Sequence, residues 1–529
     1  MCGIFTAYGA NYHWISLENS FNKISYRGPD SSSVVNVNKK LIMAFHRLAI
    51  MGLNNSGNQP MKHPNDESLI LMCNGEIYNY KELAHKYNYK LSTGSDCEII
   101  LHLFKELGVR KTIDQLDGVF MFTIYDETND ILYAGRDPMG VRPGFIASND
   151  DETFISSEAK SLIKFSKNII PFPPGTWWSS NNPSKFERYF YYDSNKLSSV
   201  DENVLLGNVK SLLTEAVVKR LMSEREIGCL LSGGLDSSLI ASIVSKNYIG
   251  RKLNTFSIGI DGSVDLQYAQ IVANFIQSKH HSIQISEKDF LDAIETVIYN
   301  IESYDTTTVR ASVGNYLVSK YIKKNTDCKV IFNGDGSDEV CCGYLYLRNA
   351  PNSKDLQAES EKLVKELYLY DVLRSDRCIS SNGLEARTPF LDKKFVKYYL
   401  SIPAELKTFN TKDKIEKDLL RKAFDDGTFL PKDVLWRRKV AFSDGVSSQE
   451  KSWHKIIQEY VNKKITDKEF SNAQRLMPHC TPLLKESYYY RKIFENFFPD
   501  SEKLIPHFWM PKWSNATDPS ARELKNYKE

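Results

Sequence analysis

The first part of the chain, up to about residue 185, consists of short hydrophobic runs separated by polar turns. Five of these runs are apolar or β-branched and predict β-strands: Gly3–Tyr8, Leu41–Phe45, Leu69–Cys73, Val119–Tyr125 and Ile131–Ala134. The last two flank the polar segment Asp126–Asp130, which predicts a hairpin. We therefore expect packed sheets with few helices in this part of the chain.

One helix is expected among these strands, because the apolar residues after Asp96 recur at three- and four-residue spacing. Ser95 or Asp96 is the predicted N-cap, and Glu98 suits the first helical turn. One apolar face of this helix comprises Ile99, Ile100, Leu103, Phe104 and Leu107.

The spacing of hydrophobic residues changes across Ser179–Asn203, a segment rich in Ser, Asn, Asp and Lys that is typical of a linker. Its Tyr and Phe residues indicate that part of it packs against the folded chain. We expect a first domain over residues 1–185, a linker over 186–203 and a second domain over 204–529. The second domain opens with apolar residues at helical spacing from Val204 to Leu221.

Strands and helices alternate in the second domain. The predicted strands are Ile227–Leu231, Thr255–Ile260, Ser282–Ile285 and Lys329–Phe332, and helices are expected near 236–247, 265–278, 288–300 and 311–323. Such alternation predicts a parallel sheet with helices on both faces. The last ~150 residues are predicted to be mainly helical.

Composition narrows the class of protein. The chain has 529 residues, 42% of them hydrophobic, and 68 Lys and Arg against 66 Asp and Glu give a net charge of +2. This balance argues against a nucleic-acid-binding protein. No apolar run approaches the ~18 residues of a membrane helix, and no secretory leader is expected. The nine cysteines form neither a C-x-x-C pair nor a zinc-site spacing, which favours free thiols in the reducing cytoplasm.

Cys2 is the first candidate for chemistry. Removal of Met1 would leave its thiol beside a free α-amine, whose ordinary pKa is about 7.7–8.0. Such an amine can act as the general base for the thiol without a separate histidine. Taken alone, Cys2 fits a small apolar residue in the first strand better than a nucleophile.

The run Leu231-Ser232-Gly233-Gly234-Leu235-Asp236-Ser237-Ser238 is the second candidate. It follows a predicted strand and opens a predicted helix, where bare N–H groups and the helix dipole favour a phosphate. The run lacks the Gly-Lys-Ser/Thr of a Walker A motif and is not G-x-G-x-x-G. Outside this context it could be only a turn.

Four motifs follow Cys2 in order: Arg27-Gly28-Pro29-Asp30, His46-Arg47-Leu48-Ala49-Ile50, Asn74-Gly75-Glu76-Ile77-Tyr78-Asn79 and Thr93-Gly94-Ser95-Asp96. With Cys2 they resemble the class II glutamine amidotransferases, which carry an N-terminal nucleophile on a sandwich of antiparallel sheets flanked by helices. The resemblance implies that Cys2 attacks glutamine and that Asn74 and Gly75 form the oxyanion hole.

The implied glutamine-binding residues are Arg47, Leu48, Ala49, Ile50, Met51, Asn74, Gly75, Glu76 and Asp96. Arg47 suits the α-carboxylate because it offers a bidentate fork, and Glu76 and Asp96 suit the α-ammonium. The structural alternatives are a surface position for Arg47, a helix-capping role for Asp96 and a hairpin turn at Asn74-Gly75.

The Gly-rich run resembles the pyrophosphate loop of ATP pyrophosphatases. Further motifs follow it in order: Tyr304–Ser312, Gly334–Glu339, Gly383–Asp392, Lys439–Gly445 and the C-terminal Trp509–Arg522. Together these motifs are similar to those of the glutamine-hydrolysing asparagine synthetases, most of all the eukaryotic cytosolic type. The resemblance spans practically the whole chain.

This resemblance implies roles for residues of the second domain. The ATP-binding residues would be Leu231, Ser232, Gly233, Gly234, Asp236, Ser237, Ser238, Ile258, Asn333 and Gly334. Asp236 and Asp338 would hold Mg²⁺, and Lys439 and Asp335 would be catalytic. Thr307, Arg310, Glu385, Arg387 and Asp392 would lie near aspartate or its adenylate. The alternative for these charged residues is a surface ion-pair network.

The chain departs from the family pattern at three positions. Asn333 and Asp335 stand where the family has Ser and Glu, and Val440 stands where Glu is usual. Asp335 is shorter by one methylene, about 1.5 Å, and misplacement by ~1 Å can cost 10²-fold in rate. Because its charge is retained, we expect an active domain with an altered rate.

The predicted fold is an α+β N-terminal-nucleophile sandwich followed by an α/β domain with a parallel sheet and a helical C-terminal part. The predicted reaction makes asparagine from aspartate and glutamine while ATP is cleaved to AMP and pyrophosphate. The alternatives are a β-lactam-synthetase-like acyl-adenylate ligase and a non-catalytic storage or regulatory protein. The expected ligands are glutamine, aspartate and ATP with Mg²⁺; nucleic-acid and membrane partners are not expected, and a homodimer stays open.

Overall fold

A computed structural model describes residues 1–9, 13–149, 151–192, 197, 201–410, 413–441, 445–447 and 452–523. Parts of the predicted linker, residues 186–203, and residues 442–444 of the Lys439–Gly445 motif lie outside these described residues. The chain forms two compact units. The first contains Met1–Tyr191, Met222–Glu226 and Ser380–Glu385, and the second contains Tyr192–Leu221, Ile227–Ile379 and Ala386–Glu529.

The first unit contains two six-stranded sheets. One has the order β10-β8-β9-β1-β3-β2, with β10 (Ile169–Pro171), β8 (Phe145–Ser148), β9 (Thr153–Ser156), β1 (Gly3–Tyr8), β3 (Leu41–Arg47) and β2 (Ser31–Asn38). The other has the order β12-β11-β7-β6-β5-β4, with β12 (Glu187–Arg188), β11 (Thr176–Ser179), β7 (Ile131–Arg136), β6 (Gly118–Asp126), β5 (Asp66–Ile77) and β4 (Met61–His63). Their strands pair antiparallel, and the predicted β6–β7 hairpin is confirmed.

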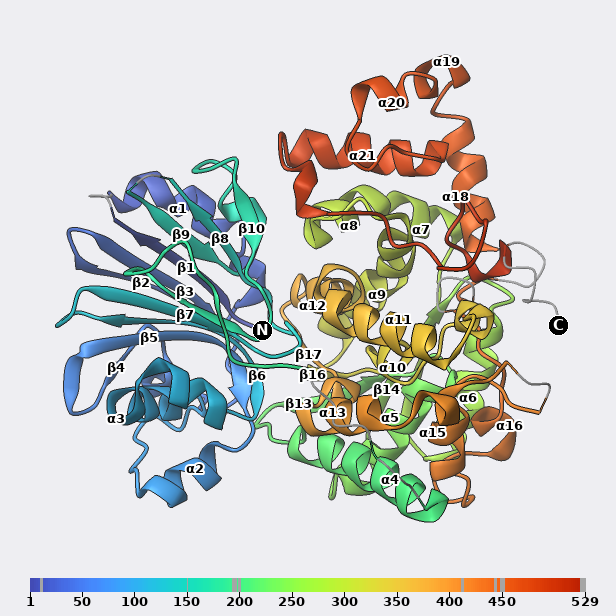
Figure 1. Cartoon of the computed structure of the whole chain (residues 1–529), viewed down its shortest axis with the longest axis horizontal. Coiled ribbons are helices and arrows are strands. Elements are labelled where there is room, and N and C mark those ends of the chain that lie inside the picture. Colours follow the sequence, from blue (N-terminus) through green and yellow to red (C-terminus); the bar gives the residue numbers. More distant parts are fainter. Residues whose placement is uncertain are drawn as a thin grey trace. The chain divides into compact units, whose positions relative to one another are not determined.

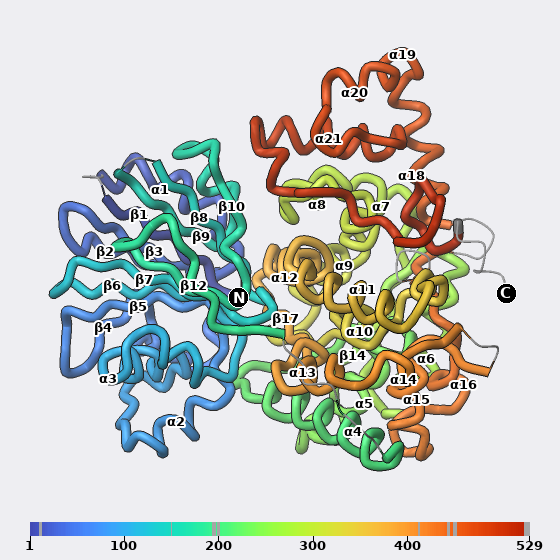
Figure 2. The backbone as a smooth tube through the Cα atoms, viewed as in Figure 1, coloured from blue at the N-terminus to red at the C-terminus, as the bar shows by residue number. Residues whose placement is uncertain are grey.

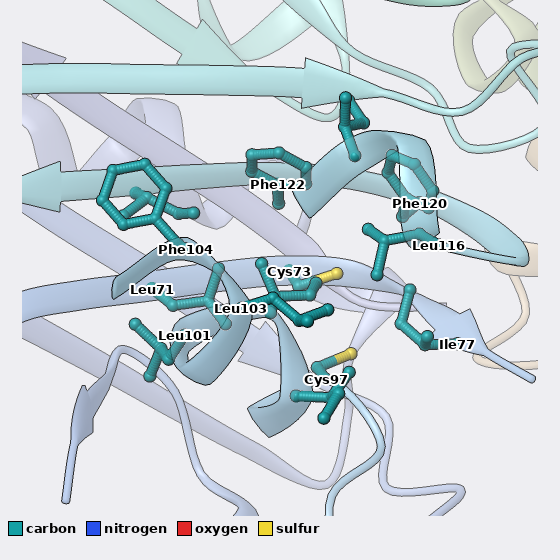
Figure 3. Close-up of a cluster of buried hydrophobic side chains, with 14 of the residues drawn as sticks. Leu71, Cys73, Ile77, Cys97, Leu101, Leu103, Phe104, Leu116, Phe120 and Phe122 are labelled. Atoms are coloured by element: carbon teal, nitrogen blue, oxygen red, sulfur yellow. The ribbon is translucent and has the colours of Figure 1, made fainter. Parts of the chain in front are cut away.

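Alternation along the strands gives each sheet two different faces. Inward side chains of both sheets, such as Ile4, Phe45, Met72 and Met121, share one buried cluster between the sheets. The opposite face of β5 and β6 is covered by α2 (Tyr80–Tyr87) and α3 (Glu98–Gln115) (Figure 1). Figure 3 shows this second cluster, in which the rings of Phe120 and Phe122 face side chains of α3. Helix α1 (Trp14–Asn22) packs on the other sheet, with Phe21 stacked on His46.

The predicted cap of α3 is wrong. Its N-cap is Cys97, and neither Ser95 nor Asp96 caps it, because the carboxylate of Asp96 accepts a hydrogen bond from the Ile77 N–H of β5 at 2.6 Å. The helix also contains a left-handed residue, Gly108 (φ 71°), which kinks it.

The second unit is built around a five-stranded sheet in the order β15-β14-β13-β16-β17. Its strands are β15 (Lys279–Gln284), β14 (Asn254–Gly259), β13 (Glu226–Leu230), β16 (Cys328–Phe332) and β17 (Glu385–Arg387). Strand β14 pairs parallel with both β13 and β15. The antiparallel sandwich and this parallel sheet confirm the predicted fold class.

Helices make up most of the second unit. They are α4 (Glu202–Lys219), α5 (Leu235–Asn247), α6 (Val264–Phe275), α7 (Glu287–Asp292), α8 (Ile294–Ile301), α9 (Thr306–Asn325), α10 (Ser337–Val340), α11 (Ser353–Glu366), α12 (Asp371–Ser380), α13 (Lys393–Ser401), α14 (Ala404–Lys407), α15 (Asp418–Ala423), α16 (Lys432–Leu435), α18 (Trp453–Asn462), α19 (Asp467–Phe470), α20 (Ala473–Leu476) and α21 (Lys485–Phe497). The helix expected near 288–300 is in fact two, α7 and α8. Helix α9 begins earlier than predicted because the Asp305 carboxylate caps it by accepting the Thr308 N–H.

The C-terminal part of the chain packs against α8 and α9. Figure 2 shows α21 running alongside α8, and the ring of Tyr304 packs on Phe494 with 4.9 Å between centroids. Further on, the N–H of Trp509 donates to the Asp305 carboxylate at 2.8 Å. None of the helices in the described residues combines the length and the apolar character that crossing a membrane demands.

Candidate active sites

Cys2 lies immediately before β1, and its backbone is held from both sides. Its N–H donates to Asn74 Oδ1 at 2.9 Å, and its carbonyl accepts from Arg27 Nε at 2.8 Å. Arg27 is in turn buried against Glu158, with 2.6 Å between Nη1 and Oε1. If Met1 is removed, the nitrogen that faces Asn74 becomes the α-amine.

The Cys2 thiol is within reach of both backbone groups of Leu48. The Leu48 N–H points at the sulfur at 3.4 Å, and the Leu48 carbonyl lies 3.6 Å away. Burial raises the pKa of this thiol. Nearby, Asn74 Nδ2 is buried and has no hydrogen-bond partner among the described residues, so one amide donor is available beside the sulfur.

A small cavity opens on this thiol. It is lined by Cys2, Arg47, Leu48, Ile50, Met51, Gly57, Gln59, Cys73, Asn74, Gly75, Glu76, Ser95, Asp96, Cys97 and Glu385. The structure thus brings together all the predicted glutamine-binding residues except Ala49, whose N–H donates to Asp30 and whose carbonyl accepts from Arg225.

Asn74 and Gly75 lie inside β5, so the hairpin-turn alternative for them is excluded. A Cβ on Gly75 would stand 2.3 Å from the Val119 carbonyl oxygen of β6. Glycine is therefore required here by the close approach of the neighbouring strand.

Arg47 is buried and lies in the cavity wall, but its guanidinium is already engaged. Nη1 donates to the Asn54 carbonyl at 2.7 Å and to Asn58 Oδ1 at 2.8 Å, and Nη2 donates to the carbonyls of Met51 and Gly52. In this structure Arg47 holds the loop Met51–Asn58 in place. The surface alternative for Arg47 is excluded, whereas the predicted fork toward a carboxylate requires some of these bonds to be exchanged.

A second carboxylate supports the loop that carries Asp96. Glu98 is buried and accepts the N–H groups of Ser92 and Thr93 at 2.7–2.9 Å, together with both of their hydroxyls. Burial alone would raise the pKa of Glu98, but hydrogen bonds from His102, Thr93 and Ser92 outweigh it and lower this pKa to about 2. Asp96 is thereby presented at the cavity from a fixed loop.

The Gly-rich run of the second unit joins β13 to α5, as predicted. Gly233 has a left-handed φ of 77°, and a Cβ there would stand 2.4 Å from the Ala269 N atom. Within the loop the Ser232 N–H donates to Ser237 Oγ at 3.2 Å. Helix α5 therefore begins at an open cavity, and the bare N–H groups of its first turn lie there, an arrangement that suits a phosphate.

This cavity, of about 1200 Å³ including its open mouth, is lined by many of the predicted residues: Leu231, Ser232, Gly234, Asp236, Ser237, Ile258, Thr307, Asn333, Gly334, Asp335, Asp338 and Lys439. Val440, one of the three departures from the family pattern, also lines it. Gly233 and Ser238 do not line it, and Ser238 is buried behind the loop.

The two predicted metal ligands converge on one lysine. Lys417 Nζ lies 2.6 Å from both carboxylate oxygens of Asp236 and 2.6 Å from Asp338 Oδ1, and Lys439 Nζ pairs with Asp338 Oδ2. These two lysines outweigh the effect of burial and hold the pKa of Asp338 well below its usual value. Lys417 was missed by the sequence analysis, because it lies far along the chain in a segment without a glycine-rich motif.

Asp335 and Asn333 are fixed by α12. Arg374 Nη2 donates to Asp335 Oδ1 and to Asp371 Oδ1, each at 2.9 Å, and Asn333 Nδ2 donates to Ser375 Oγ at 2.7 Å. Asp335 Oδ2 is buried without a hydrogen-bond partner in the described parts of the chain.

Further polar residues of the cavity wall were also missed by the sequence analysis: Glu339, Tyr344, Asp371 and Arg374. The Tyr344 hydroxyl donates to Glu339 Oε1 at 2.5 Å, and burial next to Asp371 raises the pKa of Glu339. Of these four only Glu339, which ends the Gly334–Glu339 motif, carried a sequence signal.

Four residues predicted near aspartate or its adenylate do not line this cavity in the structure. Arg310 is buried in a bidentate arrangement between Glu486 and Asp518, at 2.6–2.8 Å. Asp392 caps α13 and pairs with Arg220 at 2.8 Å. Arg387 Nη1 donates to the Arg220 carbonyl. Glu385 lines the Cys2 cavity instead and pairs with Arg142 at 3.3 Å. Arg310, Asp392 and Glu385 are thus each paired with an opposite charge, and Arg387 is hydrogen-bonded to backbone.

Comparison with known proteins finds a matching family for each of the two parts of the chain. Residues 1–191 match the glutamine amidotransferase domain family, and residues 208–365 and 348–521 match the asparagine synthase family. The asparagine synthetases [glutamine-hydrolyzing] of Rattus norvegicus and Gallus gallus are each 44% identical to this chain over 560 residues, and that of Homo sapiens is 43% identical. Each of these alignments covers 100% of this chain and 99% of the relative. The chain therefore belongs to the family of glutamine-hydrolysing asparagine synthetases.

Proposed function

We propose that this chain makes asparagine from aspartate, with nitrogen from glutamine and energy from cleavage of ATP to AMP and pyrophosphate. The observation that carries the proposal is that one chain holds two separate sites of different chemistry. One is a thiol beside an unused amide donor, and the other is a helix N-terminus facing a large cavity with paired carboxylates and lysines. Family membership and the family's activity support the same reaction.

In the first site Cys2 is the proposed nucleophile. Its sulfur attacks the carboxamide carbon of glutamine, and the oxyanion that forms would be stabilised by Asn74 Nδ2 and the Gly75 N–H. Loss of one such donor typically costs about 10²–10³ in rate. The C–N bond then breaks, ammonia leaves with a proton from the α-amine, and water hydrolyses the remaining thioester to glutamate.

Substrate recognition in this site is proposed to combine opposite charges. Arg47 would receive the α-carboxylate, and Asp96 and Glu76 the α-ammonium. All three side chains are buried around the small cavity, which supports a small zwitterionic amino acid as the substrate.

In the second site the β-carboxylate of aspartate attacks the α-phosphorus of ATP. The bond to the β-phosphate breaks, its electron pair leaves with pyrophosphate, and β-aspartyl-AMP forms. Ammonia then attacks the acyl carbon, AMP leaves, and the loss of a proton gives asparagine. Lys439 and the N–H groups of the Gly-rich loop would balance the charge of the phosphates, and Asp335 would face the reacting carboxyl group.

The residues at this site fit Mg²⁺. Asp236 and Asp338 converge on one cationic group, and Mg²⁺ is usually held by one or two carboxylates together with phosphate oxygens. When bound there, it would supply positive charge for the departing pyrophosphate. Among the described residues, no three or more His, Cys, Asp or Glu side chains are arranged so that they could hold a metal ion.

Product analysis tests this proposal. With glutamine, aspartate and MgATP, chromatography should show asparagine, glutamate, AMP and pyrophosphate in equal amounts. Cys2→Ala should abolish glutamate formation but leave asparagine formation from ammonium salts, because only the first site uses the thiol. Cys480→Ala, which changes a thiol remote from that site in the sequence, is the matched control. Loss of both activities in folded Cys2→Ala would contradict the two-site assignment.

We also propose that the protein works in the cytoplasm. All nine cysteines are free thiols in this structure, as suits a reducing compartment. Immunofluorescence of the tagged protein, with markers for organelles, tests this location.

A further inference from the structure

A buried lysine stands between the two carboxylates that are proposed to hold the metal. Lys417 Nζ is 2.6 Å from Asp236 Oδ1, 2.6 Å from Asp236 Oδ2 and 2.6 Å from Asp338 Oδ1. The side chain of Lys417 is only 2% exposed, whereas those of Asp236 and Asp338 are about one fifth exposed at the cavity. The ammonium group thus contacts both carboxylates from their buried side, and Asp338 Oδ1 is itself a buried atom.

The surrounding backbone is shaped to bring the lysine there. Lys417 has a left-handed φ of 60°, a backbone conformation that is strained for a lysine. The chain passes so close to Gly343 that a Cβ on this glycine would stand 2.0 Å from Cε of Lys417. The left-handed backbone of Lys417 and the missing side chain of Gly343 together allow the ammonium group to reach Asp236 and Asp338.

The position of Lys417 changes the net charge around the two carboxylates. Asp236 and Asp338 contribute two negative charges, and Lys417 and Lys439 contribute two positive charges at hydrogen-bond distance. The charges of these four groups therefore sum to zero without nucleotide. A free divalent cation would meet no net attraction and would have to displace an ammonium group first. The phosphates of ATP change this balance, because they bring several negative charges that can receive the lysines.

We infer that Lys417 keeps Asp236 and Asp338 closed to free divalent cations, so that the metal enters this site only together with the phosphates of ATP. In this role Lys417 is a positioning residue that competes with the cation for the same two carboxylates. The inference rests on the metal site of the proposed function, and it adds an order of binding to that site.

Binding of Mn²⁺, read by electron paramagnetic resonance, tests the inference on the full chain without turnover. Without nucleotide, the unmodified protein should bind Mn²⁺ weakly, and Lys417→Met should bind it more tightly by about tenfold or more, because one adjacent positive charge is gone. Lys417→Arg, which keeps the charge, should resemble the unmodified protein. Lys422→Met is the matched control, since Lys422 lies five residues further along the chain, on α15, and pairs with Asp418 and Glu202 instead.

A non-hydrolysable ATP analogue distinguishes the role of Lys417 from the existence of the metal site. With it, the unmodified protein should bind Mn²⁺ tightly. If Lys417→Met binds Mn²⁺ no better than the unmodified protein, while the analogue does promote binding, the inference is overturned and the metal site stands. If the analogue promotes no binding, the metal site fails and the inference with it. Should Lys417→Met not fold, the unmodified protein still decides, because equally tight Mn²⁺ binding with and without the analogue overturns the inference.

Discussion

Glu98 offers the sharpest test of how the glutamine pocket is held together. Its buried carboxylate accepts hydrogen bonds from two backbone N–H groups and two hydroxyls of Ser92 and Thr93, and it thereby fixes the loop that carries Asp96. Glu98→Gln keeps the size of the side chain, removes its charge and places an NH2 group among donors. We expect it to destabilise the first unit and to raise the KM for glutamine.

The magnitude follows from the pKa of Glu98, which falls from an ordinary 4.5 to about 2 in the folded chain. At 1.36 kcal/mol for each tenfold change, this corresponds to up to about 3 kcal/mol of unfolding free energy at pH 7. Because the folded pKa is the lower one, this stabilisation is complete above pH 4.5 and is lost as the pH falls toward 2. By linkage it should be only about 1.4 kcal/mol at pH 3.

Urea titration with pulsed hydrogen–deuterium exchange measures this difference on peptides of β5 and α3. Glu106→Gln is the control on the same helix, since Glu106 is exposed and should change stability by less than about 0.5 kcal/mol. Glu98 does not stabilise the first unit in this way if Glu98→Gln is as stable as the unmodified protein at pH 7, or if the loss of stability stays constant between pH 7 and pH 3.

Three further substitutions test the second unit. Asp236→Asn should stop AMP formation while glutamine hydrolysis continues, as measured by chromatography of AMP and glutamate; continued AMP release would remove Asp236 from the ATP site. Asp335→Ala should slow pyrophosphate release with ammonium salts by about 100-fold or more, because it leaves Arg374 without one of its two carboxylates and removes the charge beside the acyl group. An unimpaired rate would leave Asp335 with a structural role only. Arg310→Met should lower the unfolding free energy by about 3–5 kcal/mol, since it strands the buried carboxylates of Glu486 and Asp518, and should leave the KM for aspartate unchanged in the folded fraction. A raised KM at normal stability would instead place Arg310 at the substrate.

Local patterns predicted the elements of the fold well, because strand alternation and helical spacing are properties of neighbouring residues. The run Gly3–Tyr8 is β1 as predicted, and the Gly-rich run joins a strand to a helix. The predicted N-cap of α3 was wrong because of a contact with a residue outside the helix. Asp96 is a good cap by type, but it serves the N–H of Ile77 instead, and no local pattern reveals that partner.

Arg310 shows why a motif does not reveal the surroundings of each of its residues. Thr307 and Ala311 are separated by four positions on α9 and share the face that lines the cavity. Arg310 is turned by about 60° from Thr307 around the helix and meets Glu486 and Asp518. Both of these partners come from the C-terminal part of the chain, so the contact is invisible to the sequence. Lys417 was missed for the same reason, since only folding brings it to Asp236 and Asp338.

The central claim is that aspartate is activated as an acyl-adenylate, and transfer of an oxygen atom tests it most directly. Aspartate labelled with ¹⁸O in the β-carboxylate is incubated with glutamine and MgATP, and the products are analysed by mass spectrometry. Attack of the carboxylate on the α-phosphorus predicts one ¹⁸O in the phosphate of each AMP, one in the carboxamide of asparagine and none in pyrophosphate. AMP without label, or ADP together with labelled inorganic phosphate, would contradict the claim.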